Sequence, residues 1–386
     1  MTLMATDKKS ICFIIPRFVT FSTGGAELQV HNLSQQFLKM GWHVELVCRG
    51  SKHQKQITES PFFDPRIRYR YYPPSPSLCF EFFSVFLRLC QTRTFWLYNR
   101  TDDAATAAMV LFARLTGKKS IYALACDDDA SLGKYGNLYR QIGYRNLLKR
   151  WLRLADAVIL DGMIEWAKRK SSLVFCQTAD QKVAVEKNFH RPTEIIPNSF
   201  IFDNNTHPEK ENIVLWVGNF RAPKQPAIFL EIAQQLNHHT NWQFVMIGEP
   251  DDATRPLLEQ MEHLPTFTFK GSLSYEETHQ WFQKAKIYIN TSSIEGFPNT
   301  FIQAWLSKCH ILSLNTDPDG LLTVKGLGKV FHNDKALLID HLDHWLAHPE
   351  KMDQDLDKAL LFATQYFDIN RNIQKILYQL NNTVPL

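Results

Sequence analysis

The segment 285–305 constrains the fold more than any other part of the chain, because it passes from a strand to a helix across one short loop. Residues 285–290 form an apolar, strand-like run, and a small polar loop follows at 291–293. Glu295 and a glycine come next. The apolar residues after them recur at helical spacing, with Pro298 suited to the first helical turn. A strand, a glycine loop and a helix in this order are typical of a parallel α/β domain.

The start of this helix is suited to hold a phosphate group. The amides of a first helical turn have no acceptor inside the helix and lie at the positive end of its dipole. Glu295 precedes them and would face whatever the phosphate carries, and Gln303, eight residues later, lies on the same side. The pattern therefore predicts a site for a nucleotide-activated ligand.

The length and composition indicate a globular protein of two domains. A chain of 386 residues can bury two ordinary cores, and 45% hydrophobic with 21% charged residues is a globular balance. Seven scattered cysteines without a Cys-x-x-Cys pair argue against a disulfide framework and a structural zinc site, and favour a reducing compartment. A polar amino terminus and short apolar runs predict a cytoplasmic protein, at most attached to a membrane surface.

The net charge of +4 conceals a difference between the two halves of the chain. Residues 1–200 hold 28 Lys and Arg against 17 Asp and Glu, a net of +11. Residues 201–386 hold 15 against 22, a net of −7. A basic first half is expected to meet something anionic, such as a membrane surface, a phosphorylated acceptor or a nucleic acid. No nucleic-acid motif accompanies the charge, so we expect no nucleic-acid partner.

The first half is predicted to be a Rossmann-like, acceptor-side domain over residues 1–200. A helix over 27–40 follows a glycine loop and ends at Gly41, so the domain opens with a strand–loop–helix–strand unit. Strands are predicted at 11–15, 44–48, 95–98, 120–125, 157–160 and 173–176.

A Pro- and Asn-rich break over 195–208 is predicted to be a linker, followed by a second, donor-side Rossmann-like domain over 209–365. Its strands are predicted at 213–217, 243–247, 266–269, 287–290 and 311–314, with final helices at 334–347, 351–366 and 369–382. The last helix, within 366–386, is expected to pack back on the first domain. Ligands of open α/β sheets bind beyond the carboxyl ends of the strands, so we expect a cleft between two facing domains. The loops expected to line it are 16–26, 126–133, 218–224, 248–250 and 291–300.

Two further loops carry candidate ligand-binding residues. Gly24 and Gly25 follow the first strand, where glycine lets the backbone approach a ligand closely, although two glycines before a helix are as often a plain turn. Arg221 and Lys224 follow the first strand of the second domain and could clamp a diphosphate. By themselves they would indicate a solvated basic loop. The expected convergence with segment 295–305 favours a binding site instead.

A set of motifs in one order resembles the retaining glycosyltransferases of family 4, which have the GT-B fold. The motifs are Gly24-Gly-Ala-Glu27, Ile196-Pro-Asn-Ser199, Trp216-Val-Gly218 with Lys224, Val245-Met-Ile-Gly248, Phe269-Lys-Gly271 and Asn290-Thr-Ser-Ser-Ile-Glu-Gly-Phe-Pro-Asn299. The resemblance covers roughly residues 10–330, and its motifs are more specific in the second half than in the first.

The resemblance implies transfer of a sugar from a nucleotide sugar with retention, and without a required metal or other cofactor. Glu295 would contact the donor sugar, and Gln303 would meet the ribose. Arg221 and Lys224 would neutralise the departing diphosphate, because without a metal its charge must be met by cations and helix-end amides. The glycine pair of the first domain would approach the donor. The residues that would hold the phosphate are Gly296, Phe297, Pro298, Asn299 and Thr300.

The chain departs from the family pattern at three places. Gln303 replaces a carboxylate, which predicts a weaker or altered nucleotide preference because an amide loses the charge-assisted hydrogen bond. Asn219 stands where the family often has Arg, and Arg221 could substitute for it. An aspartate loop at 125–130 replaces a His near the sugar. There Asp127 or Asp128 could take an acceptor-side role, such as that of a base, or the loop is a solvated turn or helix cap.

The basic surplus has a focus at 145–153, where Trp151 and three leucines share one helical face and the basic residues lie mostly off it. Such a helix could lie on an anionic membrane, or it could be a core helix with a solvated basic side. The aromatic segment 80–86 allows the same two interpretations, and core packing is favoured for both.

The leading hypothesis is a metal-independent, hexosyltransferase-like glycosyltransferase acting on a glycan or lipid-linked acceptor in surface polysaccharide or glycolipid synthesis. It would work in the cytoplasm or on the cytoplasmic membrane face. One alternative is a nucleotide-sugar 2-epimerase of the same fold, with the aspartate loop removing the proton. Another is a non-catalytic nucleotide-sugar binder, in which Gln303 marks a degenerate site.

Overall fold

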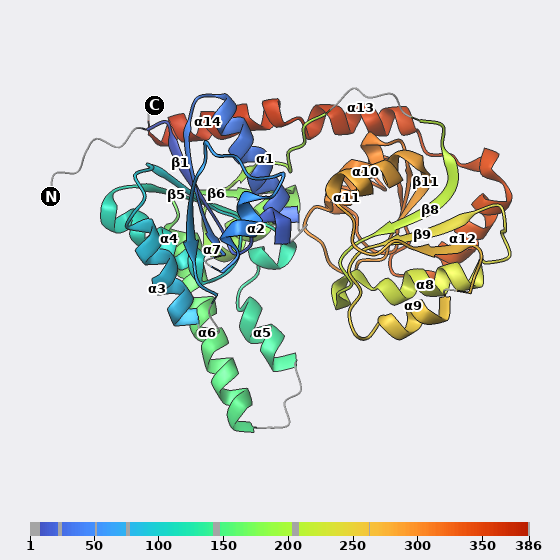
Figure 1. Ribbon diagram of the computed structural model, residues 1–386, viewed down its shortest axis with the longest axis horizontal. Coiled ribbons are helices and arrows are strands. Elements are labelled where there is room, and N and C mark those ends of the chain that lie inside the picture. The colour runs from blue at the N-terminus through green and yellow to red at the C-terminus, as the bar shows by residue number, and fades with distance from the viewer. Residues whose placement is uncertain are drawn as a thin grey trace. The chain divides into compact units, whose positions relative to one another are not determined.

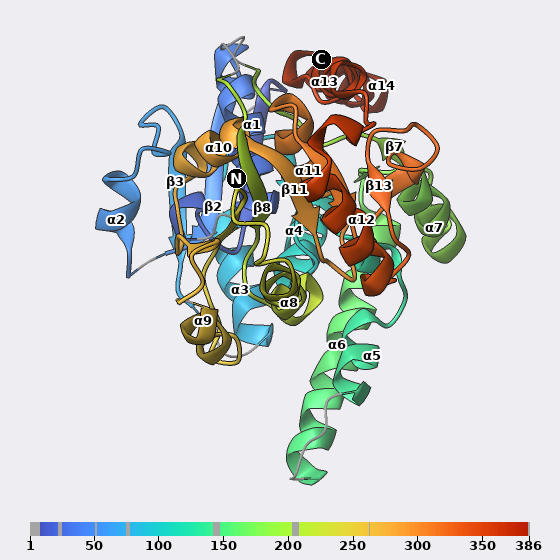
Figure 2. The ribbon, with the colours of Figure 1, turned by 90° about the vertical axis from the view of Figure 1, so that its right-hand side faces the viewer.

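The computed structural model describes residues 8–21, 25–50, 52–74, 78–141, 147–202, 208–261 and 263–384. The chain forms two compact units, of which the first comprises Met1–Ile201 with Ile369–Leu386 and the second Phe202–Asp368. Each unit has one parallel sheet covered by helices (Figures 1 and 2). The expected α/β fold class, with two Rossmann-like sheets, is confirmed.

The first unit has a seven-stranded parallel sheet in the order β3-β2-β1-β4-β5-β6-β7. Its strands are β1 (Ser10–Ile15), β2 (His43–Arg49), β3 (Arg68–Tyr72), β4 (Trp96–Asn99), β5 (Lys119–Ala123), β6 (Leu173–Cys176) and β7 (Glu194–Ile195). All residues of β1 are buried, since it pairs with β2 and β4 and is covered on both faces. A strand of this kind is a continuous apolar run, so it is easily identified from sequence.

Helices cover both faces of this sheet. The odd residues of β1, such as Phe13, pack with α1 (Gly25–Lys39) and α14 (Ile369–Thr383), while Cys12 and Ile14 pack with α3 (Leu78–Leu89) and α4 (Ala104–Thr116). The other helices are α2 (Gln54–Thr58), α5 (Lys134–Gln141), α6 (Leu147–Lys170) and α7 (Ala179–Phe189), with short 3-10 turns η1 (Val19–Phe21) and η2 (Asp127–Ala130).

The strand expected at 157–160 is wrong, because these residues lie inside the long helix α6. Ala157, Leu160 and Ile164 are buried at helical spacing, whereas the β-branched Val158 and Ile159 between them are exposed. Packing of the helical face therefore overrides the local preference of β-branched residues for strands. The sequence also missed β3, an edge strand of alternating Arg and Tyr, and the two-residue strand β7.

The second unit has a six-stranded parallel sheet in the order β10-β9-β8-β11-β12-β13. Its strands are β8 (Glu211–Val217), β9 (Gln243–Ile247), β10 (Phe267–Phe269), β11 (Ala285–Asn290), β12 (His310–Ser313) and β13 (Lys329–Val330), the last of which the sequence missed. Its helices are α8 (Pro226–Gln235), α9 (Arg255–Met261), α10 (Tyr275–Lys284), α11 (Asn299–Leu306), α12 (Lys335–Ala347) and α13 (Leu356–Tyr366), with 3-10 turns η3 (Ala222–Lys224), η4 (Pro318–Gly320) and η5 (Pro349–Lys351).

The last helix, α14, belongs to the first unit. The Ile369 amide donates to the Phe200 carbonyl at 3.1 Å, and the Gln36 side chain donates to that of Asn370 at 2.8 Å. Part of the expected linker is held against helix α1, since the Asn32 side chain of that helix donates to the Ser199 carbonyl at 3.0 Å. Residues 203–207 of that linker lie outside the described residues. Within the described ranges, no helix has the length and apolar character needed to cross a bilayer.

Candidate functional site

The loop after β11 carries the central candidate, Glu295, in the second unit. β11 and β8 are hydrogen-bonded neighbours in a parallel sheet, so the loops that follow them emerge side by side. The Glu295 carboxylate forms an ion pair with the Lys224 ammonium, which comes from the loop after β8. The Ser292 hydroxyl donates to the same carboxylate oxygen at 2.7 Å. The structure thus brings together Lys224 and Glu295, two residues that the sequence predicted for one site.

A buried hydroxyl joins the two loops beneath this pair. The Thr291 hydroxyl donates to the Lys224 carbonyl at 2.7 Å and accepts from the Trp216 indole at 2.9 Å. The Ser293 amide donates to the Pro223 carbonyl at 2.8 Å. These bonds fix the backbone that carries Lys224 against the loop that carries Glu295. The sequence marked this loop as small and polar but did not indicate these roles.

The loop after β9 approaches the same place closely. Gly248 has a φ of +151°, and a Cβ atom there would lie 1.9 Å from the Gly218 carbonyl oxygen. The Gly218 amide in turn donates to the Ile247 carbonyl at 3.0 Å. Only glycine fits such a contact, so Gly248 allows the ends of β8 and β9 to meet. Arg221, just beyond, is exposed and makes no ion pair with the described acidic residues.

Helix α11 begins at Asn299. The sequence predicted Pro298 in the first helical turn, so the helix begins one residue later than expected. Pro298 occupies the capping position, and no side chain caps the helix there. The Thr300 hydroxyl accepts from the Tyr288 hydroxyl at 2.8 Å. Gly296 and Pro298 are buried in the turn that leads into the helix. The helix start therefore lies beside Glu295, as the sequence predicted, and no side chain forms a capping hydrogen bond there.

Phe297 and Gln303, like Pro298, have buried side chains. The Phe297 ring packs against Phe367, with ring centroids 5.0 Å apart, so only its backbone is placed to meet a ligand. Gln303 is 6% exposed, and its side chain shares a hydrogen bond with Tyr275, at the start of α10. Burial raises the pKa of Tyr275 to about 12, so this hydroxyl stays protonated. The sequence did not indicate Tyr275 as a partner of Gln303.

The remaining candidates lie in the first unit. Gly25 begins α1 and is exposed, whereas Gly24 lies outside the described residues. Asp127 and Asp128 are both exposed in η2, after β5. The Gln181 side chain donates to Asp127 at 2.8 Å. Although Asp127 has access to solvent, desolvation of its carboxyl group, reinforced by neighbouring carboxylates, raises its pKa to about 6.

The third aspartate of this loop has a structural role. Asp129 is buried and accepts from the amides of Ala125 and Cys126 at 2.7 and 3.0 Å. It also pairs with the Lys134 ammonium at 2.5 Å. Lys168, buried in α6, donates to the Asp129 carbonyl at 2.6 Å. The helix-cap interpretation of the aspartate loop therefore holds for Asp129, which fixes the loop that presents Asp127.

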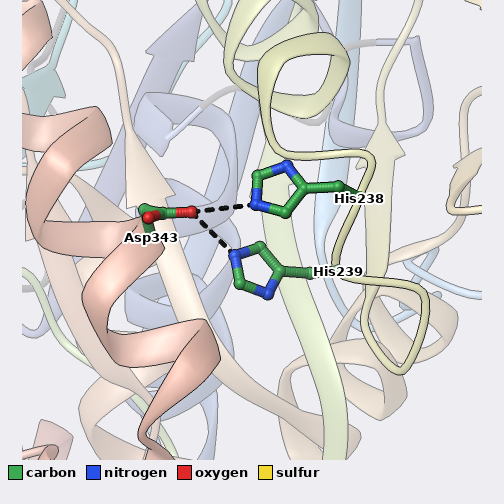
Figure 3. A group of neighbouring side chains, drawn as sticks. All are labelled: His238, His239 and Asp343. Carbon is green, nitrogen blue, oxygen red and sulfur yellow. Dashed lines mark hydrogen bonds and ion pairs between the residues drawn. The ribbon is translucent and has the colours of Figure 1, made fainter.

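One group of described residues could hold a metal ion: His238, His239 and Asp343 (Figure 3). One Asp343 oxygen lies 3.2 Å from His238 Nε2 and 2.7 Å from His239 Nε2. The histidines precede β9, whereas Glu295 follows β11. Since the strands are parallel, the group lies at their amino ends, whereas Glu295 lies at their carboxyl ends. The group therefore takes no part in that site.

The segment that carries Lys224 and Glu295 lies inside a match to a known family. Residues 198–359 match the model of a family described as glycosyl transferases group 1. The Vi polysaccharide biosynthesis protein VipC/TviE of Salmonella typhi is 25% identical over 139 residues, which are 35% of this chain and 23% of that protein. The chain thus matches less than a quarter of the length of this relative.

Solved structures share the fold of nearly the whole chain. The Anabaena protein HepE, in complex with UDP and glucose, has a TM-score of 0.71 and 16% identity, over 96% of this chain and 99% of that chain. Sucrose-phosphate synthase from Thermosynechococcus elongatus has a TM-score of 0.72 and 14% identity, over 97% of this chain and 99% of that chain. In sequence, residues 198–359 are therefore similar to the group 1 glycosyl transferases, and the whole chain shares the two-domain GT-B fold of these solved structures.

Proposed function

We propose that this chain is a retaining glycosyltransferase of family 4. It would move a sugar from a nucleotide sugar to a glycan or lipid-linked acceptor during synthesis of a surface polysaccharide or glycolipid. The observation that carries the proposal is the Lys224–Glu295 pair beside the start of α11, inside the segment that matches the family. HepE binds UDP and glucose, and VipC/TviE serves polysaccharide synthesis, which supports a nucleotide-sugar donor.

The chemistry of the site suits a nucleoside diphosphate leaving group. The bond between the anomeric carbon and the phosphate oxygen breaks, and the diphosphate leaves with the electron pair. Lys224 and the amides at the start of α11 would stabilise this charge without a metal, and the exposed Arg221 would add a second cation. Glu295, released from Lys224 by the incoming phosphate, would accept hydrogen bonds from sugar hydroxyls. Gln303 would hydrogen-bond the ribose.

For the acceptor side we propose Asp127 rather than Asp128. Gln181 orients the Asp127 carboxylate, and its pKa of about 6 lies closer to neutrality than that of an ordinary aspartate. A carboxylate with this pKa can hold the acceptor hydroxyl and take up its proton at neutral pH.

The test is a panel of nucleotide sugars incubated with the chain, with and without lipid-linked acceptors. Release of a nucleoside diphosphate together with a glycosylated product is expected. NMR of the new linkage would show the donor's anomeric configuration, and an inverted linkage would rule out the retaining reaction. A product with an altered sugar and an intact nucleotide bond would identify an epimerase instead. Binding without any turnover would identify a non-catalytic binder.

A further inference from the structure

Helix α6 of the first unit has an apolar face that the described residues leave uncovered. Trp151 is 70% exposed and Ile159 is 58% exposed, and Leu152 and Val158 are also mostly exposed. These four residues lie on one side of the helix, because successive residues are about 100° apart. The opposite side carries the buried Leu160 and packs into the unit. Large apolar side chains on the outer side cannot contribute to the core of this unit.

Helix α3 carries a second uncovered stripe. Phe80, Phe83 and Leu87 lie on one face at spacings of three and four residues, and all are more than half exposed. The side chain of Phe83 is 62% exposed and that of Leu87 is 63% exposed. Single exposed apolar residues are ordinary, but a row of three on one helix face is not. The expectation that this aromatic segment packs in the core holds only for the other side of α3.

Partly buried residues connect the two helices that carry these stripes. Phe82 and Phe86 of α3 are partly buried in one cluster with Met163 and Trp166 of α6. On the surface of α3, Phe82 and Phe86 are adjacent to Phe83. On α6, Met163 and Trp166 lie four and seven residues after Ile159, on the flank of the α6 stripe. Helix α4 packs against both α3 and α6, and Phe82 of α3 also packs with Leu160 and Ile164 of α6. The stripes and the partly buried residues between them form one apolar surface, which we name the α3–α6 surface.

The sequence around the start of α6 is basic without any acidic residue. Residues 130–155 contain six Lys and Arg and no Asp or Glu. Among the described side chains, Arg140 of α5 and Arg153 of α6 are exposed. The hairpin of α5 and α6 extends away from the sheet of its unit (Figures 1 and 2). An exposed apolar surface with a tryptophan and cationic residues at its outer end is the combination that binds anionic bilayers.

We propose that the α3–α6 surface docks the first unit onto an anionic lipid bilayer. Trp151 and Phe83 would enter the boundary between headgroups and acyl chains, and Arg140 and Arg153 would meet lipid phosphates. A second copy of the chain is the less suitable occupant, because the first half carries a net charge of +11 and would repel its copy. The docking does not depend on the proposed transfer reaction, although it would bring the first unit to lipid-linked acceptors.

The test uses the full chain and vesicles of phosphatidylcholine with or without phosphatidylglycerol. Co-sedimentation is expected with the anionic vesicles. The double variant Phe83→Ser, Trp151→Ser should bind at least about tenfold more weakly, because it loses the free energy that the two aromatic side chains gain when they move from water into the bilayer. Val324→Ser with Leu361→Ser is the matched control, because both residues are highly exposed in the second unit, and it should bind as the native chain does.

Two further measurements separate docking from misfolding. Brominated phosphatidylcholine should quench part of the tryptophan fluorescence of the native chain, and Trp151→Phe should lose that quenching while it keeps its binding. Arg140→Gln with Arg153→Gln should lower binding to anionic vesicles about fivefold per charge. Unchanged binding by a folded Ser double variant would overturn the proposal. A dimer that the same double variant dissociates would also overturn it, by assigning the surface to self-association.

Discussion

Lys224 and Glu295 are 71 positions apart in the chain, and their side chains form an ion pair between the loops after β8 and β11. Both are partly exposed, so a ligand can reach them. The pair holds the Lys224 ammonium against the segment that leads into α11. An incoming diphosphate would compete with Glu295 for this ammonium, and the released carboxylate would turn to the sugar.

Replacement of the cation tests this exchange. Lys224→Met should weaken binding of a nucleoside diphosphate by about ten- to a hundredfold, because one charge-assisted contact to phosphate contributes about 1.5–3 kcal/mol. Isothermal titration with UDP and GDP measures the loss. Lys284→Met is the control, since Lys284 is exposed in the same unit, lies over the Trp281 ring and precedes β11, at the other end of the strands from Lys224. Equal affinities of Lys224→Met and the native chain would contradict the assignment.

Glu295→Gln should separate binding from transfer. The variant removes the partner that competes for Lys224, so affinity for the nucleoside diphosphate should stay the same or rise. Transfer should fall about a hundredfold or more, because a neutral amide holds the sugar hydroxyls more weakly as charge develops. The comparison needs kcat for transfer and Kd for the diphosphate from the same preparation. A joint loss of both would show that Glu295 serves mainly to hold the loop through Ser292.

Gln303 offers a test of nucleotide preference. Gln303→Glu should strengthen binding of nucleoside diphosphates about tenfold if the side chain meets ribose hydroxyls, since a carboxylate accepts stronger hydrogen bonds than an amide. Thermal shifts with ribose and 2′-deoxyribose diphosphates check this, because only the ribose form should gain. If both forms gain equally, or neither gains, the side chain does not contact the 2′-hydroxyl. Tyr275→Phe is the companion variant, as it removes the present partner of Gln303.

The sequence predicted the parts of the fold whose pattern is local. Buried central strands such as β1 and β9 are continuous apolar runs. Between β11 and α11, a glycine turn separates the strand-like run from apolar residues at helical spacing. The same local signal placed Lys224 and Glu295 in loops that follow strands, and the structure shows that these strands, β8 and β11, are neighbours. The edge strand β3 was missed because Arg and Tyr alternate along it. No apolar run marks such a strand.

Other features depend on contacts that no local pattern contains. The four residues 157–160 resemble a strand, but their helical state follows from the packing of Leu160 and Ile164 in the unit. Asp129 differs from Asp127 only in what surrounds it, namely Lys134 and two amides. The Tyr275–Gln303 contact joins α10 and α11 and is likewise invisible in the sequence. The sequence thus located the candidate site and left the roles of its supporting residues open.

Gly248 should be intolerant of any side chain. A Cβ atom would lie 1.9 Å from the Gly218 oxygen, and the backbone has a positive φ that other residues rarely adopt. Gly248→Ala should therefore destabilise the protein by more than about 3 kcal/mol, or prevent folding of the second unit. Gly162→Ala is the matched control, because a Cβ atom there meets nothing within 4 Å in helix α6. It should stabilise the chain by about 0.5–1 kcal/mol. Urea unfolding measures both, and similar midpoints would contradict the argument.

His310 should make the second unit sensitive to acid. The residue is buried at the start of β12, where its ring packs against Trp345 with centroids 5.3 Å apart, and burial lowers the pKa of His310 to about 4. The unfolded chain has the ordinary pKa of about 6.5. Between these two values the unfolded state binds a proton that the folded state does not, so stability must fall as the pH decreases from about 6.5 to 4. From pH 7 to pH 5 the loss should be about 2 kcal/mol. His310→Gln cannot take up this proton, so its unfolding free energy should fall less between the same two pH values. Urea titrations of both proteins at pH 7 and pH 5 give the comparison, and parallel losses would show that His310 does not titrate as a buried neutral group.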